Sequence, residues 1–279
     1  MLVNGGLRGA VALIFRKRKL FAGQNKKNLP STPLYSPDNC CIFGNNNYLS
    51  LLLYPIMLQP ATLQFLKDLQ KHNNKPWFDE NRHRYDAAKT NFLQFTDEVI
   101  KAFGKKDANI AGLTARECIF RINRDIRFSK DKTPYKRNLA VSLNKGGKKS
   151  ILAGYYFHLE PGNNSFIGGG VWQPMPADLQ KVRQEIDYNL KDFQKILNAK
   201  NFKTIYGGLS EEEGIALSRV PKGYEADNPA AEYLKLKSFI TMTNINDKEL
   251  TDKGLLKQTV QAFETIQPLI NFLNEALEA

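Results

Sequence analysis

Apolar residues recur at alternating spacings of three and four along several stretches of the chain. This spacing gathers side chains on one stripe of an amphipathic helix, and a glycine commonly ends such a helix. The clearest stripe stops at Gly104 and consists of Tyr85, Ala88, Phe92, Phe95, Val99 and Phe103. A shorter stripe predicts a helix that opens near Met57 and stops near Asn73, before a turn at residues 75–78.

The C-terminal half carries further helical patterns. The longest begins after Pro174, with Pro176 suited to a first helical turn, and its stripe is Leu179, Val182, Ile186, Leu190, Phe193 and Leu197. A short helix is expected after Asn228 and Pro229. A terminal helix is expected from about Asp252 to Leu277, with Pro268 kinking or interrupting it.

In the middle of the chain the period changes to two, which is typical of strands. It predicts a strand over residues 118–128 that bends near Asp125, strands over 138–143 and 154–160, a hairpin partner over 165–172, and a short strand over 239–243. Strands cluster centrally and long helices lie on both sides of them in sequence. We therefore predict the α+β class, with a central, mainly antiparallel sheet flanked by long amphipathic helices.

The first 56 residues differ in kind from the rest. They hold seven Lys or Arg and a single acid, Asp38, and they show no amphipathic period. Their apolar stretches are shorter than the ~18 residues of a membrane span, and the apolar segment before Arg16 precedes its basic cluster, the reverse of a signal peptide. We interpret residues 1–56 as a non-domain extension, either a mis-assigned start or a disordered tail, with a transit peptide as the rival. Residues 57–279 are predicted to form a single α+β domain.

Charge argues for a local rather than a global anion site. The chain has a net charge of +12, of which residues 1–56 supply +6, so +6 remains for residues 57–279. The three cysteines and three histidines show none of the spacings of a zinc site or a disulfide framework, which favours a reduced, cytoplasmic setting and predicts no metal built on histidine. No cofactor motif is complete, so the cofactor stays open.

The densest charge cluster spans residues 121–136 and contains three arginines and three lysines around two aspartates. Converging guanidinium groups recognise phosphate or carboxylate with paired hydrogen bonds. The alternative is an internal lattice of ion pairs, and a further alternative is direct catalysis. The candidate ligand-binding residues of this cluster are Arg121, Arg124, Asp125, Arg127, Lys132 and Tyr135.

The predicted hairpin offers a second constellation. A four-residue loop at 161–164 would place His158 opposite Ile167 and Tyr156 opposite Gly169, so that the glycine leaves room beside Tyr156 and His158. Residues two apart on a strand point the same way, so His158 and Glu160 could form an acid–base pair, although a lone histidine is more often structural. Tyr156 and Trp172 are the candidate ligand contacts here.

With these residues in view, the chain resembles the uncharacterised "domain of unknown function 2461" family of bacteria and some fungi. The resemblance rests on a signature matched by Arg121, Arg124, Asp125, Arg127, Phe128, Asp131, Lys132 and Tyr135, and on a second block over residues 157–172. It covers about Met57 to the C-terminus and leaves residues 1–56 outside. It implies a cytoplasmic domain of this size and supplies no activity.

Three functions are therefore carried forward. The first is a protein that binds an anionic ligand, phosphorylated or carboxylated, with a small molecule favoured over a nucleic-acid backbone and no membrane partner. The second is a hydrolase or transferase acting on an anionic substrate, with His158 and Glu160 as acid and base. In the third, the charged motif is purely structural. Whether the protein is an enzyme, and its oligomeric state, stay open.

Overall fold

The computed structural model describes residues 57–211, 214 and 216–279. The predictions made for residues 1–56 lie outside this range. The N-terminal helices of the described part are α2 (Pro60–Lys71), α3 (Lys75–Glu80), α4 (Arg82–Phe103), α5 (Ala108–Ala111) and α6 (Ala115–Cys118). They are followed by β1 (Leu139–Asn144), β2 (Gly154–Leu159) and β3 (Ser165–Val171). The C-terminal half contains α7 (Pro176–Tyr188), α8 (Leu190–Asn198), α9 (Lys200–Tyr206), α10 (Ala231–Leu234), β4 (Phe239–Ile245), the 3-10 turn η2 (Glu249–Thr251) and α11 (Leu255–Glu278).

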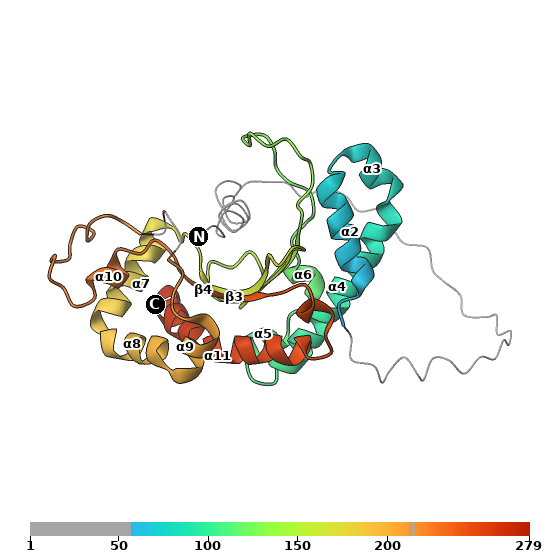
Figure 1. The fold of residues 1–279 in the computed structure, drawn as a ribbon. Coiled ribbons are helices and arrows are strands. Elements are labelled where there is room, and N and C mark those ends of the chain that lie inside the picture. The colour runs from blue at the N-terminus through green and yellow to red at the C-terminus, as the bar shows by residue number, and fades with distance from the viewer. Residues whose placement is uncertain (1–56, 212–213, 215) are drawn as a thin grey trace, which may run out of the picture.

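The four strands form one antiparallel sheet in the order β1-β2-β3-β4. Helices α4 and α11 run beneath this sheet, with α2 and α3 at one end and α7 to α10 at the other (Figure 1). The predicted α+β class with a central antiparallel sheet is confirmed.

One face of the sheet, which we call the Phe157 face, forms the main core. The Phe157 ring lies 6.1 Å from that of Phe92 and 5.3 Å from that of Phe95, both on α4. Tyr155 packs edge-on against Phe103 at 4.7 Å and lies 5.1 Å from Phe263 of α11. Aromatic pairs at these spacings add to the burial of their apolar surface, so this face ties the sheet to both long helices.

Most predicted helices are found where the spacing placed them, with three differences. Residues 75–78 begin helix α3 rather than a turn, because the Asn74 side chain accepts a hydrogen bond from the Trp77 amide and caps a helix there. The stripe from Leu179 to Leu197 is divided between α7 and α8 at Asn189. Helix α11 continues through Pro268 without interruption.

The predicted register of the β2–β3 hairpin is wrong by one residue. His158 pairs with Phe166, and Tyr156 pairs with Gly168. The connection spans residues 160–164 rather than 161–164. Gly162 and Asn163 both have positive φ, and the Glu160 amide donates to the Ser165 hydroxyl instead of to a backbone carbonyl of β3. Gly169 therefore lies beside Tyr155 on the Phe157 face, and Phe166 lies beside His158.

The strand predicted over residues 118–128 is also absent from the described structure. Helix α6 ends at Cys118, and this stretch keeps only isolated bridges, from Ile119 to Val141 and from Asn123 to Tyr135. The chain leaves the sheet edge and projects away from it. In the part of the chain that the structure describes, none of the helices is long and apolar enough to cross a bilayer.

Candidate functional site

The charged cluster forms a projecting loop with a hydrogen-bonded base. The Lys136 amide donates to the Ile122 carbonyl and the Arg124 amide to the Pro134 carbonyl, both at 2.8 Å. These bonds hold two arms together, and the loop rises from the sheet on the side opposite α11 (Figure 1). We call residues 121–137 the arginine loop. Residues 121–124 and 133–137 are its two arms, and residues 125–132 are its tip.

Arg124 holds this loop together from inside. Its side chain is only 8% exposed, and it donates to Asp131 Oδ2 at 2.6 Å, to the Thr133 carbonyl at 3.0 Å, to the Thr133 hydroxyl and to the Ser129 hydroxyl at 3.2 Å. A guanidinium group has five N–H donors, and four contacts within one loop leave little capacity for a ligand. Arg124 therefore acts as a brace between the arms and the tip.

Arg127 is paired at the surface. It binds Asp125 through two parallel hydrogen bonds of 2.9 Å, although its side chain is 72% exposed. Lys132 donates to the carbonyl of Ile126 at 3.1 Å. Arg124 and Arg127 are thus engaged by different carboxylates, and these two guanidinium groups do not converge on one anion position.

Hydrogen bonds within the loop stabilise the carboxylate of Asp131. The backbone N–H of Thr133 donates to it at 2.9 Å and the Thr133 hydroxyl at 2.8 Å, while Arg124 contacts its other oxygen. These bonds favour the carboxylate, and they lower the pKa of Asp131 to about 2. The charge state of Asp131 is therefore coupled to the folding of the tip.

Tyr135 belongs to the core rather than to an exposed site. It is buried, and its ring stacks on Phe78 with a centroid distance of 3.9 Å. The Asn73 side-chain amide accepts from the Tyr135 N–H at 3.0 Å and donates to its carbonyl at 2.9 Å. The returning arm of the loop is thereby attached to the turn between α2 and α3.

The second constellation lies on the opposite face of the sheet, the His158 face, which bears Ala140, Tyr156, His158, Phe166 and Ile240. His158 is fully buried, its ring stacks on Phe166 at 4.6 Å and 9°, and its Nε2 lies 3.0 Å from Oε2 of Glu160. Its Nδ1 has no hydrogen-bond partner among the described residues.

Opposing influences act on Glu160. Burial favours the neutral acid, but the hydrogen bond and charge of His158, the charge of Arg137 and a hydrogen bond from Asn138 favour the carboxylate. Together they hold the pKa of Glu160 below its usual value. Glu160 can therefore fix the orientation of the imidazole, which is what an acid–base pair needs. A reacting group could use this pair only by reaching Nδ1.

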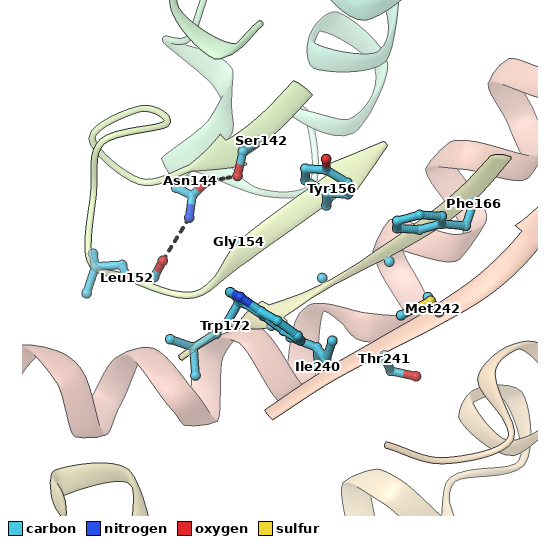
Figure 2. A pocket seen from close by; sticks show the side chains of 14 residues that line it. Ser142, Asn144, Leu152, Gly154, Tyr156, Phe166, Trp172, Ile240, Thr241 and Met242 are labelled. Atoms are coloured by element: carbon cyan, nitrogen blue, oxygen red, sulfur yellow. Dashed lines mark hydrogen bonds between the residues drawn. The ribbon is translucent and has the colours of Figure 1, made fainter. Parts of the chain in front are cut away.

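Beside this pair the His158 face is hollowed. The cavity volume of the hollow is about 50 Å3, whereas a single water molecule needs roughly 10–15 Å3. Its aromatic walls are Tyr156, Phe166 and Trp172, and Figure 2 shows the Trp172 indole extending toward Ile240. Burial, and secondarily the charge of Glu160, raises the pKa of Tyr156 well above its usual value, so its hydroxyl stays protonated.

Several residues of the hollow were not foreseen from the sequence. Ser142 and Asn144 line it from β1, while Phe166 and Ile240 line it from β3 and β4. The two polar residues did carry a signal, because they alternate with Val141 and Leu143 in a strand pattern and so share a face. Phe166 was assigned to the wrong face by the register error.

The structure thus separates the predicted site residues into two groups. Arg121, Arg124, Asp125, Arg127 and Lys132 belong to the arginine loop, with Tyr135 buried at its base, whereas Tyr156, His158, Glu160 and Trp172 lie on or beside the His158 face. Among the described residues, no group of three or more His, Cys, Asp or Glu side chains is arranged to hold a metal ion.

The chain was compared with known proteins in three ways. No curated protein matches it, and no solved structure matches it. The model of one protein family, described as "Conserved hypothetical protein (DUF2461)", matches residues 61–272, a stretch that contains both groups of candidate residues. The chain therefore belongs to the DUF2461 family of conserved hypothetical proteins.

Proposed function

We propose that this protein binds single-stranded nucleic acid through the arginine loop. The observation that carries the proposal is the concentration of charge. Residues 121–137 contain seven Lys or Arg and two Asp, a net charge of +5, whereas residues 57–279 as a whole carry +6. The rest of that segment is nearly neutral, so the loop is where a polyanion would be attracted.

The placement of the charges favours an extended anion over a compact one. Arg124 is used inside the loop and Arg127 is paired with Asp125. The other exposed cations are distributed along the loop, with Arg121 and Arg137 on the arms and Lys130 and Lys132 at the tip. Successive phosphates of one strand can meet such a row, whereas a small phosphorylated metabolite needs donors that converge.

The tip adds an aromatic contact. Phe128 is 93% exposed, and the Arg127 guanidinium lies 5.8 Å from its ring centre. Basic residues beside an aromatic ring are the usual means of holding an unpaired base, because every base has a face that can stack. A membrane surface is less favoured, since interfacial binding scales with buried apolar area and Phe128 is the only large apolar side chain exposed on this loop.

The test is fluorescence anisotropy of the full chain with labelled single-stranded oligonucleotides across a salt series. We expect wild-type affinity to fall with salt, and the R121Q/K130Q variant to lower the slope of log K against log salt by about 1.4, since each phosphate contact on a single strand contributes roughly 0.7. Phe128→Ala should weaken binding about 5- to 150-fold at every salt concentration, because stacking on one base contributes ~1–3 kcal/mol.

Lys191, an exposed lysine of α8, provides the matched control. Lys191→Gln should bind like wild type. The proposal is wrong if the oligonucleotides do not bind or if the loop variants bind as Lys191→Gln does. Tighter binding to phosphatidylserine vesicles than to oligonucleotides would assign the loop to membranes instead.

Acid–base catalysis on an anionic substrate is the second candidate. It is supported by the 3.0 Å contact between His158 and Glu160 and by the Nδ1 atom of His158 that no described residue binds. The test is a screen of chromogenic phosphate and carboxylate esters, followed by His158→Asn. Turnover lost at an unchanged melting temperature would support catalysis, and turnover retained in that variant would exclude His158 as the acid or base.

A further inference from the structure

We infer that the hollow of the His158 face is a separate binding site for an uncharged planar ring that carries an N–H donor. None of the described residues that line it is charged. The site therefore differs in kind from the arginine loop. An ionised group placed in the hollow would lose its hydration and find no opposite charge.

The walls select a flat, apolar group. The rings of Tyr156 and Phe166 are 5.7 Å apart and inclined by 29°, and Trp172 and Ile240 close the other side. Aromatic rings contact one another favourably in offset or edge-on arrangements, and most small-molecule sites combine such walls with a few polar groups.

The floor stays free of side chains because the sheet requires glycine there. A Cβ atom at Gly168 would lie 2.3 Å from the Thr241 carbonyl oxygen, and one at Gly170 would lie 2.0 Å from the Phe239 carbonyl oxygen. Gly170 also has a φ of +121°, a conformation essentially restricted to glycine. The pairing of β3 with β4 therefore keeps the space over these residues open.

The polar edge determines which hydrogen bond the ligand must make. The Asn144 amide nitrogen donates to the Leu152 carbonyl at 2.7 Å, which fixes the amide so that its oxygen faces Ser142 (Figure 2). The Ser142 hydroxyl donates its only proton to that oxygen. Ser142 can then only accept a further bond, so the complementary ligand edge is a hydrogen-bond donor, and the N–H group of an indole or a nucleobase supplies one.

The probes for this site are indole, 1-methylindole and indole-3-carboxylate. Binding is followed in the full-length chain by the 15N–1H resonance of the Trp172 indole, and Trp77→Phe removes the second tryptophan signal. We expect indole to shift this resonance and to bind about 5- to 10-fold more tightly than 1-methylindole, because one hydrogen bond contributes roughly 1 kcal/mol. We also expect indole to bind more tightly than the carboxylate.

Two variants make the test specific. Ser142→Ala should remove the preference for indole over 1-methylindole, and Ile240→Trp should fill the hollow and abolish binding of every probe. Phe128→Ala should leave all probe affinities unchanged, so the result is independent of nucleic-acid binding by the loop. Absence of any shift at the solubility limit, equal binding of the two indoles, or preference for the carboxylate would each overturn the inference.

Discussion

The arginine loop and the hollow of the His158 face are built on opposite principles. The loop is exposed and charged, and hydrogen bonds among its own residues hold it in shape. The residues that line the hollow are uncharged, and its shape follows from the strand register and the glycine backbone. A dense cluster of charged residues is therefore not by itself a binding site. Arg124, at the centre of the motif, is used to build the loop, while Arg121, Lys130 and Phe128 are exposed and are the residues that we propose contact nucleic acid.

The largest effect is expected from a side chain placed on the glycine floor of the hollow. Gly170→Ala should lower the free energy of unfolding by about 3 kcal/mol or more, because it combines a strained backbone with a clash against β4. Gly207→Ala is the control, since Gly207 has a φ of +75° but open space around its Cβ position, and it should cost only about 1–2 kcal/mol. Urea denaturation measures both, and equal losses would show that β4 adjusts to the added methyl group.

A smaller effect is expected when the brace of the loop is removed. Arg124→Ala deletes four hydrogen bonds and should destabilise the loop by about 2 kcal/mol. Hydrogen exchange should then accelerate at the backbone amides of residues 124 and 136, which close the base of the loop. Arg127→Ala removes only an exposed pair and should change stability by less than about 0.5 kcal/mol. Equal protection in both variants would mean that Arg124 does not hold the loop.

The smallest effect is a pH dependence confined to the loop. The pKa of Asp131 is lowered from 3.8 to about 2 in the folded protein. Its stabilising contribution is therefore complete above about pH 4 and is lost as the pH falls through about 2. The Thr133 amide resonance should report this transition in NMR spectra, and Asp131→Asn should remove it. A midpoint near 4 would show that the hydrogen bonds to Asp131 do not favour its charged form.

Much of the fold could be read from the sequence because single elements carry their own signal. The stripe from Tyr85 to Phe103 is long enough to specify one helix, and the alternation over residues 154–160 specifies a strand without knowledge of its partner. The break of the helical stripe at Asn189 was missed because both halves keep the same apolar spacing. The short helices α5, α6 and α9 carry too few residues for a period to emerge.

The two candidate sites were harder to predict, because their geometry depends on how segments of the chain pair with one another. The hairpin register changes with one residue in the turn, and that residue decides whether Phe166 or Ile167 lies beside His158. The spacing of the arginines likewise shows that charge is concentrated but not which guanidinium group turns inward. The positions of Ser129, Asp131 and Thr133, which accept hydrogen bonds from the Arg124 side chain, decide that Arg124 turns inward.

The attachment of the arginine loop to Asn73 couples two segments that lie far apart in the sequence. The side-chain amide of Asn73 pairs with the backbone N–H and C=O groups of Tyr135, as a neighbouring strand would. A side chain thus attaches the loop to the turn between α2 and α3. Replacing Asn73 would therefore remove both hydrogen bonds to the Tyr135 backbone, so the geometry at the base of the loop depends on a residue 62 positions earlier in the chain.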